Sequence, residues 1–273
     1  MVTKLLPLIP QHGIYVEPFG GGASMLLARE PSAVEVYNDL NSGLVNFFRV
    51  LRNKKQFDEF HRLASLTPFS REEHDLFNST WASTTDPVER AHQFFVVARS
   101  SFGGIFGNTW GHTVASSSRG MAGSVARYLG AVEKLPEVST RLLRVQVEHG
   151  NALNVIERYD TPETFFYLDP PYALSTRKSG GYEHEMEDAQ HRQLVELLLT
   201  VKGKVLLSGY PTPLYAKLEE SGWHTQRWQA ICSASGRTRL NGLMGAGKAK
   251  LKQQRIEAVW FNYETGQDMG LAP

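Results

Sequence analysis

The spacing of hydrophobic residues predicts alternating strands and helices at both ends of the chain. Residues 14–16 and 34–37 are short β-branched and aromatic runs, and hydrophobic residues recur at helical spacing over 44–51. Strand patterns return at 143–147, 164–168, 205–208 and 256–262, with a helical pattern over 189–199. Strands that alternate with helices are typical of a doubly wound, mostly parallel sheet of the Rossmann-like α/β class.

The middle of the chain follows a different pattern. From about Asn53 to Glu148 the periodicity is helical with charged faces, interrupted by a glycine-rich aromatic segment at 102–111 and a Ser/Gly-rich segment ending near Gly123. We therefore expect two domains: an α/β domain of residues 1–52 and 145–273, and a mainly helical inserted domain of residues 53–144.

A carboxylate and a phenol follow the most apolar strand of the predicted sheet. The run Phe-Phe-Tyr-Leu at 165–168 leads directly into Asp169, Pro170, Pro171 and Tyr172. In open α/β sheets ligands bind at the carboxyl ends of the strands, and two prolines hold a rigid, extended turn. A turn without chemistry is the alternative for this tetrapeptide, but its place after a buried strand favours a catalytic loop.

This loop suits chemistry on a poorly nucleophilic amino group. The amino nitrogen of adenine shares its lone pair with the ring, so a catalyst must return electron density to it. The carboxylate of Asp169 and the carbonyl of Pro170 can accept its two hydrogens, while Tyr172 stacks on the base. No covalent intermediate is needed. Because an adenine inside a duplex cannot reach such a loop, this hypothesis also requires the nucleotide to flip out.

A second candidate site follows the first strand. Residues 19–22 (Phe-Gly-Gly-Gly) form a strand-to-helix turn in which missing side chains let a ligand approach the backbone. Asp39 ends the next strand, a position from which carboxylates take ribose hydroxyls. The turn matches neither GxGxxG nor a P-loop, which disfavours a dinucleotide or a triphosphate. An adenosyl ligand suits both features, and a helix-capping role is the alternative for Asp39.

Two further groups are candidates for ligand binding. Asn151 follows the strand predicted to end near residue 147 and is a candidate contact for the adenine of a cofactor. His184, Glu187, Asp188 and His191 lie at helical spacing. We interpret these four as the polar face and N-terminal turn of a helix, because no second ligand cluster accompanies them. We therefore expect no metal site.

The composition indicates which broad class of protein this is, but not which ligand it binds. The 273-residue chain has one cysteine, Cys232, which excludes a disulfide framework and CxxC metal spacing. No run is long and apolar enough for a signal peptide or a membrane span. We expect a cytoplasmic protein with no membrane partner.

Net charge gives no support for a nucleic-acid partner, whereas the distribution of charge does. The chain carries only +1 overall, but residues 236–255 hold six basic residues, including Arg237 and Arg239, and no acidic one. A loop that contacts a phosphate backbone is one interpretation of this segment. A solvated loop without a ligand is an equal alternative.

Together these motifs resemble the adenine-specific DNA methyltransferases of the family that contains the bacterial DNA adenine methyltransferase. The resemblance runs from about Ile14 to Tyr263 and keeps the family's motif order. Its segments are 17–22 (Glu-Pro-Phe-Gly-Gly-Gly), 37–41 (Tyr-Asn-Asp-Leu-Asn), 168–172 (Leu-Asp-Pro-Pro-Tyr), 205–210 (Val-Leu-Leu-Ser-Gly-Tyr) and 255–263 (Arg-Ile-Glu-Ala-Val-Trp-Phe-Asn-Tyr).

The resemblance implies methyl transfer from S-adenosylmethionine to N6 of a flipped-out adenine in double-stranded DNA, leaving S-adenosylhomocysteine and using no metal. Phe19 and the glycines would border the methionine end of the cofactor, Asp39 would take the ribose, and Asp169 and Tyr172 would face the base. The expected cofactor contacts are Pro18, Phe19, Gly20, Gly22, Asp39, Leu40, Asn151 and Asp169. We expect a monomer on DNA in a bacterial or phage-infected cell, with restriction–modification among the roles that the family implies.

By the same resemblance the inserted domain recognises the target sequence. Residues 99–104 are similar to a stretch in which an aromatic side chain wedges into the base stack, so Phe102 is the candidate wedge. Arg99 and Arg119 are candidate phosphate contacts, and Arg237 and Arg239 complete the expected DNA contacts. A core position is the alternative for Phe102.

Two departures from the family stand beside these matches. Ala23 occupies a position where the family more often has glycine, a small change that alanine should tolerate. The family's Gly-Gly-Lys loop before the first strand has no match here, and Lys4 is not its equivalent. Either the natural start is upstream, or the methionine carboxylate is held otherwise, or cofactor affinity is reduced. We therefore expect weak binding of S-adenosylmethionine. The alternatives are a catalytically impaired DNA-binding relative, or an amino methyltransferase of RNA adenine or of cytosine. Asp at 169, where a cytosine enzyme would carry Ser, favours adenine. A nicotinamide-dependent oxidoreductase is disfavoured because GxGxxG is missing.

Overall fold

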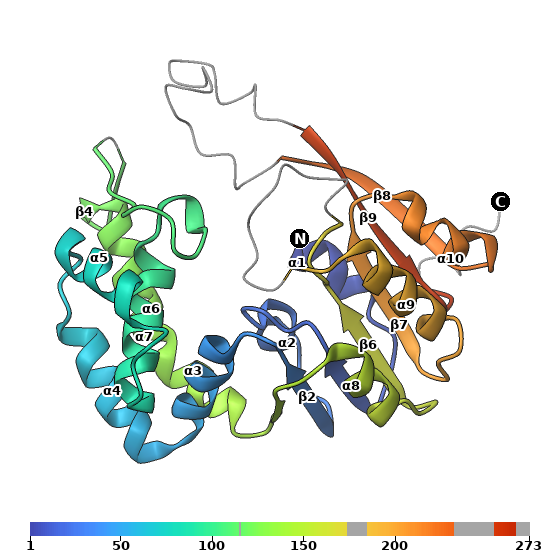
Figure 1. Cartoon of the computed structure of the whole chain (residues 1–273), viewed down its shortest axis with the longest axis horizontal. Helices are drawn as coiled ribbons and strands as arrows, with labels where there is room; N and C mark the ends of the chain where they lie inside the picture. The colour runs from blue at the N-terminus through green and yellow to red at the C-terminus, as the bar shows by residue number, and fades with distance from the viewer. Residues whose placement is uncertain (115, 174–184, 232–253, 266–273) are drawn as a thin grey trace. The chain divides into compact units, whose positions relative to one another are not determined.

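The computed structural model describes residues 1–114, 116–173, 185–231 and 254–265 and divides the chain into two compact units (Figure 1). The first unit contains Met1–Ser42, Arg144–Ala230 and the chain from Arg255. The second contains Gly43–Leu143 and, among the other described residues, Ile231 and Gln254. The boundary expected at residues 52 and 53 falls between two helices of the second unit.

The first unit is built on a seven-stranded sheet of order β5-β2-β1-β6-β7-β9-β8. Its strands are β1 (Ile14–Glu17), β2 (Val34–Asn38), β5 (Gln146–Glu148), β6 (Thr164–Leu168), β7 (Lys204–Gly209), β8 (His224–Ile231) and β9 (Gln254–Phe261). Pairing is parallel from β5 through β7, and β9 runs antiparallel to β7. The expected mostly parallel α/β sheet is therefore confirmed.

The order of the strands reverses at the middle of this sheet. From β1 the chain adds β2 and β5 on one side, and then returns to place β6 and β7 on the other side. β1 and β6 are direct neighbours, with Val16 opposite Phe166. A reversal of this kind leaves a crevice beyond the carboxyl ends of the two strands, where doubly wound folds bind ligands. The segments after β1 and β6 are the two candidate site loops.

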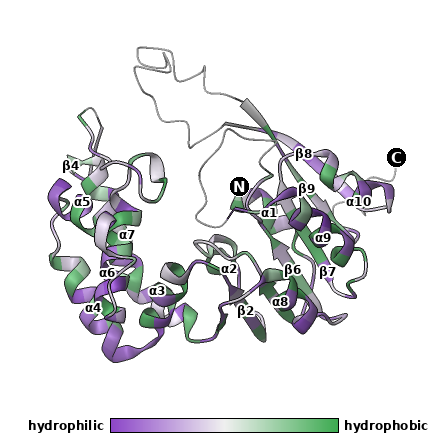
Figure 2. Cartoon of the chain, viewed as in Figure 1, coloured by the Kyte–Doolittle hydropathy of each residue, from purple (hydrophilic) through white to green (hydrophobic). Residues whose placement is uncertain are grey.

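The two faces of the sheet bury different side chains, because alternate residues of a strand point to opposite sides. One face packs Val16, Phe166 and Leu207 in a core with α8 (Ala152–Tyr159), α9 (Asp188–Leu198) and α10 (Ala216–Glu220). Figure 2 shows hydrophobic and hydrophilic stretches together on α8 and α9, as expected of helices that cover a sheet. The other face carries rings, including Tyr15 and Phe165 with centroids 5.9 Å apart.

Short helices precede and follow the first strand. α1 (Val2–Leu5) and the 3₁₀ turn η1 (Leu6–Leu8) come before β1, and the hydroxyl of Tyr263 donates to the carbonyl of Leu8 at 2.9 Å. α2 (Ser24–Ala28) begins after Ala23, which is buried at a left-handed φ of 54°. Glycine adopts that conformation with less strain than alanine. Alanine in place of the family's usual glycine therefore lowers the stability of the fold by about 1 kcal/mol.

The second unit is mainly helical in its described part. Its helices are α3 (Ser42–Arg52), α4 (Lys54–Leu66), α5 (Arg71–Thr80), α6 (Pro87–Ser100) and α7 (Gly123–Leu142), with a hairpin of β3 (Ser117–Ser118) and β4 (Met121–Ala122). Asn53, Ser70 and Asp86 each accept a hydrogen bond from a backbone amide of the helix that follows. Stacked and edge-on rings such as Phe47 and Phe95, with centroids 6.0 Å apart, form its core.

Two strands of the seven-stranded sheet differ from the prediction. The strand expected at 143–147 is β5 at Gln146–Glu148, because α7 continues to Leu142 and leaves Leu143 60% exposed. β8 was not predicted at all. Its sequence His-Thr-Gln-Arg-Trp-Gln-Ala-Ile lacks an apolar alternation, and it lies at the edge of the sheet, where fewer residues need to be buried. No helix in the described ranges is long and apolar enough to cross a membrane.

Candidate active site

Asp169 lies at the carboxyl end of β6, beside the end of β7. Leu168 pairs with Leu207, so Asp169 and Ser208 are the next residues along two parallel strands. The hydroxyl of Ser208 donates to Oδ1 of Asp169 at 2.8 Å. Asp169 is surrounded by protein atoms, and this burial raises the pKa of its carboxyl, against the opposing hydrogen bonds from Ser208 and Tyr172. The residue is nevertheless exposed to solvent, so a ligand can reach it.

The rest of the catalytic loop packs closely against the same strand ends. Pro170 is buried, and Pro171 and Tyr172 are half-buried. The rings of Tyr172 and Tyr210 meet edge to face with centroids 4.4 Å apart. Tyr172 therefore contacts both the carboxylate of Asp169 and the aromatic ring that follows β7. This contact fixes the plane of its ring beside the carboxylate.

The glycine-rich loop after β1 is held by the end of β2. The amide of Gly20 donates to the carbonyl of Asn38 at 2.8 Å. The hydroxyl of Tyr37 donates to the carbonyl of Gly21 at 2.8 Å, and the amide of Gly21 donates to Oδ2 of Asp39 at 2.8 Å. Every contact in this set comes from three consecutive residues, the last two of β2 and Asp39 after it, so the loop has a defined shape without a ligand.

The three glycines of this loop serve different purposes. A Cβ on Gly20 would lie 2.2 Å from the ring of Tyr37, so this glycine is required by protein packing. Gly21 has a φ of +47° and no atom within 4 Å of a built Cβ, and Gly22 meets only the hydroxyl of Ser24 at 3.9 Å. The space beside Gly21 and Gly22 is therefore open to a ligand that approaches the backbone.

Asp39 holds backbone amides on both sides of the end of β2. Its Oδ2 accepts the amide of Gly21, and its Oδ1 accepts the amide of Asn41 at 2.7 Å, just before α3. A carboxylate oxygen has two lone pairs, so each still has capacity for a ligand hydroxyl. Leu40, the next residue, is 46% exposed, which is unusual for a leucine beside a buried strand. Its side chain is available to an apolar ligand surface.

Asn38 is a site residue that the sequence interpretation missed. It is fully buried, and its Nδ2 donates to the carbonyls of Pro18 at 2.8 Å and Gly150 at 2.9 Å. Its Oδ1 accepts the amide of Gly150 at 2.9 Å. One side chain thus joins the ends of β1, β2 and β5. An amide at the end of a buried strand was the available signal, but its partner is 112 residues away.

Asn151 lies at the same edge but has a structural partner. Its Oδ1 accepts the amide of Leu153 at 2.8 Å and caps α8. The residue is exposed. The side-chain amide nitrogen of Asn151 is the group that a cofactor could use.

A buried carboxyl, Glu17, shares the sheet edge with Asp169 and was also missed as a site residue. It is 1% exposed, and Oε1 accepts the hydroxyl of Tyr15 at 2.5 Å. Burial is the main reason that the pKa of Glu17 rises to about 7, and the negative charge of Asp169 raises it further. An acidic residue that ends an apolar strand is the signal that could have identified it.

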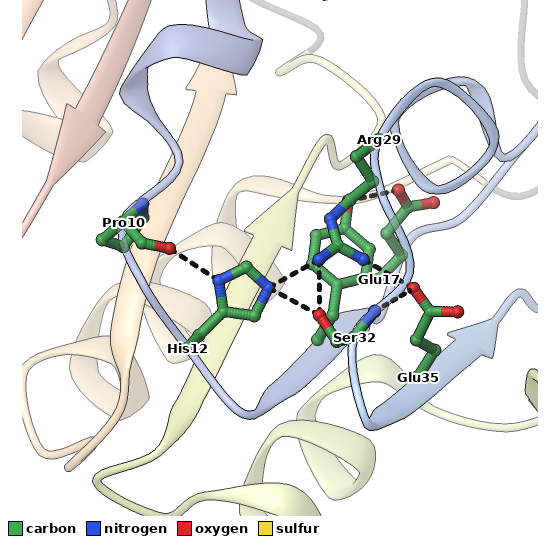
Figure 3. Close-up of polar contacts among 7 residues, drawn as sticks. Pro10, His12, Glu17, Arg29, Ser32 and Glu35 are labelled. Carbon is green, nitrogen blue, oxygen red and sulfur yellow. Dashed lines mark hydrogen bonds and ion pairs between the residues drawn. The ribbon is translucent and has the colours of Figure 1, made fainter.

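A network of polar side chains lies behind Glu17 (Figure 3). The guanidinium of Arg29 stands 4.1 Å from the ring centre of Tyr15 and pairs with Oε1 of Glu35 at 2.6 Å. Arg29 also contacts Nε2 of His12 at 2.8 Å, and Nδ1 of His12 contacts the carbonyl of Pro10 at 2.6 Å. Because arginine only donates, Nε2 accepts and Nδ1 carries the proton. The imidazole is therefore neutral, and burial lowers its pKa.

The candidate wedge Phe102 lies at the base of a closed loop in the second unit. It is half-buried, and its amide donates to the carbonyl of Thr109 at 2.7 Å. His74 is fully buried and holds the same loop, with Nδ1 2.7 Å from the hydroxyl of Ser100 and Nε2 2.9 Å from the carbonyl of Asn108. The loop therefore presents Phe102 from a fixed base.

The candidate phosphate contacts have different surroundings. Arg99 lies exposed in the last turn of α6, where nearby protein atoms lower the pKa of its guanidinium. Arg119 has a φ of 56° at the turn between β3 and β4 and forms a two-bond ion pair with Glu133 at 2.8 and 2.9 Å. Arg237 and Arg239 lie outside the described residues.

The helix predicted to carry the histidine–carboxylate group is present, but one assignment on it is wrong. Glu187 and Gln190 form a reciprocal cap at the start of α9, and Asp188 is its first residue, as expected. His191 lies in the core instead of on the polar face: it is fully buried, with Nδ1 2.9 Å from the hydroxyl of Tyr215. His184 lies outside the described residues. No group of three or more potential metal ligands occurs among the residues described.

Fold and site together define a class of protein before any comparison is made. The sheet is mostly parallel and has seven strands. At its reversal point a glycine-rich turn follows β1 and the reachable carboxylate of Asp169 follows β6. This arrangement is consistent with a methyltransferase fold. Residues 1–231 match the family described as D12 class N6 adenine-specific DNA methyltransferase, and the chain belongs to this family. The suspected family and the expected enzyme class are confirmed, and DNA is the substrate of the family. A comparison with curated protein sequences found no match.

Proposed function

We propose that this chain transfers a methyl group from S-adenosylmethionine to the N6 amino group of an adenine flipped out of double-stranded DNA. The observation that carries the proposal is the geometry of Asp169. Its carboxylate is reachable at the reversal point of the sheet, and Ser208 fixes Oδ1 at 2.8 Å. A carboxylate has about four lone-pair sites, so acceptor capacity remains for an amino hydrogen of adenine.

The loops at the same sheet edge fit the adenosyl cofactor. Open space beside Gly21 and Gly22 suits the methionine end of the cofactor, which would also border Pro18 and Phe19. Asp39 retains capacity for the ribose hydroxyls, and the exposed side chain of Leu40 offers an apolar surface beside it. When bound, S-adenosylmethionine supplies a methyl carbon that is electrophilic because it is attached to a positively charged sulfur.

The chain's own groups prepare the amino nitrogen for attack. Asp169 accepts one amino hydrogen and the carbonyl of Pro170 the other, which returns electron density to the nitrogen. With the cofactor bound, the nitrogen lone pair would form the new N–C bond, and the electron pair of the broken C–S bond would stay on the sulfur. The nitrogen then loses one proton, for which Asp169 is the acceptor. Because the surrounding protein atoms raise its pKa, its carboxylate is a stronger base than an ordinary aspartate.

DNA recognition in this proposal belongs to the second unit. Phe102 would enter the base stack when the adenine leaves it, and Tyr172 would stack on the flipped base. Arg99 would contact a phosphate directly, whereas Arg119 would exchange its bonds with Glu133 for bonds to phosphate. Arg237 and Arg239 are the remaining proposed DNA contacts. We expect the protein to act as a cytoplasmic monomer on DNA.

Transfer of labelled methyl from S-adenosylmethionine to unmethylated DNA tests this function. The product is digested to nucleosides, and the wild-type chain is compared with Asp169→Ala, Asp169→Asn and the exposed control Asp58→Asn. We expect labelled N6-methyldeoxyadenosine from the wild type and from the control, and none from either variant at 169. Label in N4-methyldeoxycytidine, or equal transfer to RNA, would replace the proposed substrate.

A further inference from the structure

Asp169 is joined to two hydroxyl groups that have no assigned role. Ser208, on β7, is 1% exposed and donates to Oδ1 of Asp169 at 2.8 Å. Tyr167 lies two residues before Asp169 on β6, so its side chain points to the same face of the sheet. It is 6% exposed, and its hydroxyl lies close enough to Ser208 to lower the pKa of the phenol, against the larger opposite effect of burial. The two hydroxyls and the carboxylate therefore lie on one face of two neighbouring strands, where they can form a hydrogen-bond chain.

The chemistry of these groups gives the chain one direction. A serine hydroxyl has a single hydrogen, and Ser208 gives it to an ionised carboxylate, which can only accept. Ser208 must therefore accept its other bond, and Tyr167 is the donor. Burial raises the pKa of Tyr167 well above its usual range, so the phenol keeps its hydrogen. Protons point from Tyr167 to Ser208 and from Ser208 to Asp169.

This arrangement ties one oxygen of the carboxylate to the sheet. Oδ1 is committed to the sheet through Ser208, which sits on a strand paired on both sides, with β6 and with β9. The orientation of the carboxylate is then set by backbone positions in the most buried part of the fold. Tyr172, in the same loop, also hydrogen-bonds to the carboxylate, and the acceptor capacity that remains is left to the reacting group. Burial raises the pKa of Glu17 on β1 and of Tyr215 after β7, and the charge of Asp169 adds to both shifts.

We propose that Ser208 is a positioning residue for methyl transfer, and that Tyr167 supports it by fixing the direction of the Ser208 hydroxyl. The inference rests on the proposed function of Asp169. Without Ser208, Oδ1 would lose the hydrogen bond that orients the carboxylate toward the amino group. The reacting geometry, and not the binding of DNA or cofactor, would be lost.

The experiment compares Ser208→Ala, Tyr167→Phe and the double variant in single-turnover methyl transfer to a DNA substrate. Tyr215→Phe is the matched control. It removes a buried hydroxyl near Asp169 that hydrogen-bonds to His191, and not to Ser208 or Tyr167. Ser208→Cys, which keeps a weak donor of similar size, guards against a folding defect in Ser208→Ala. The dissociation constants for DNA and S-adenosylmethionine and the melting temperature are measured for each variant.

A hydrogen bond to a charged group predicts a rate about 10-fold to 100-fold lower for Ser208→Ala, with both dissociation constants within about 2-fold of wild type. Tyr167→Phe should lower the rate about 3-fold to 10-fold in the wild type and have no further effect in the Ser208→Ala background. Because the lost bond lowers the pKa of Asp169, the acid limb of the pH–rate profile should move to higher pH in Ser208→Ala and less so in Ser208→Cys.

A folded Ser208→Ala or Ser208→Cys chain with wild-type rate and pH profile would overturn the proposal. Additive losses of rate in the double variant would also overturn it. If the hydroxyl of Tyr167 acts through Ser208, its removal has no further effect once Ser208 is replaced by alanine. Equal losses in Tyr215→Phe would show that any buried hydroxyl matters there, which also overturns it. Absence of transfer by the wild-type chain is a different result, because it removes the proposed function itself.

Discussion

Replacing Asn38 with aspartate is the sharpest test of how the cofactor edge is held together. The substitution keeps the shape of the side chain and the acceptor for the amide of Gly150, but it removes both donors to the carbonyls of Pro18 and Gly150. Each buried carbonyl left without its donor costs about 1–3 kcal/mol, and a fully buried carboxylate adds more. We expect a loss of about 3–6 kcal/mol, a large part of a typical domain's stability.

Denaturant unfolding at pH 8 and at pH 4.5 measures this loss. Protonation of the new carboxyl restores one donor and removes the charge, so the deficit should shrink at the lower pH. Asn46→Asp is the control, because Asn46 is not buried and its side chain donates one hydrogen bond, to the carbonyl of Pro87 at 2.9 Å. A loss below about 1 kcal/mol at pH 8, or a loss that does not depend on pH, would refute the role assigned to this amide.

Three further predictions concern single substitutions. Glu17→Gln should stabilise the fold at pH 8 and leave its stability unchanged near pH 4. The folded protein raises the pKa of Glu17 from 4.5 to about 7, so the free energy of unfolding falls by up to about 3 kcal/mol as pH rises from 4.5 to above 7. Glutamine cannot ionise and therefore avoids this loss. Thermal unfolding at the two pH values checks the sign, and equal shifts at both would contradict it. Gly20→Ala should cost about 1–3 kcal/mol and weaken cofactor binding, because its Cβ would meet Tyr37 at 2.2 Å; titration calorimetry with an unchanged affinity would exclude this. Glu133→Gln should free Arg119 and tighten DNA binding with a steeper salt dependence; an unchanged slope would remove Arg119 from the phosphate contacts.

Sequence patterns were sufficient for the parts of the site that depend on strand ends. The strand before Asp169 is fully buried, as its run of apolar residues predicts, and Asp39 follows β2 as expected. Both positions follow from local sequence, because a buried parallel strand must end in a loop at the carboxyl edge. The expected weak binding of S-adenosylmethionine stays a prediction.

The parts that could not be predicted depend on which distant residues become neighbours. Ser208 acquires its role because β7 pairs with β6, and this pairing places it 2.8 Å from a residue 39 positions earlier in the chain. His191 looked polar at helical spacing, yet its partner Tyr215 lies inside the core. No local sequence pattern predicts either pairing. Hydrophobic spacing indicates which face of an element is buried, but not which polar side chain of another element that face will contact.

The support of the glycine-rich loop by β2 has a consequence for how this site can change. Gly20 has no room for a side chain because the ring of Tyr37 fills the space, and the hydroxyl of that ring also holds the carbonyl of Gly21. The two positions therefore form one unit of variation: a side chain at 20 becomes acceptable only together with a smaller residue at 37, which would release the loop. Combinatorial libraries that vary 20 and 37 together should return pairs that libraries of single changes never contain.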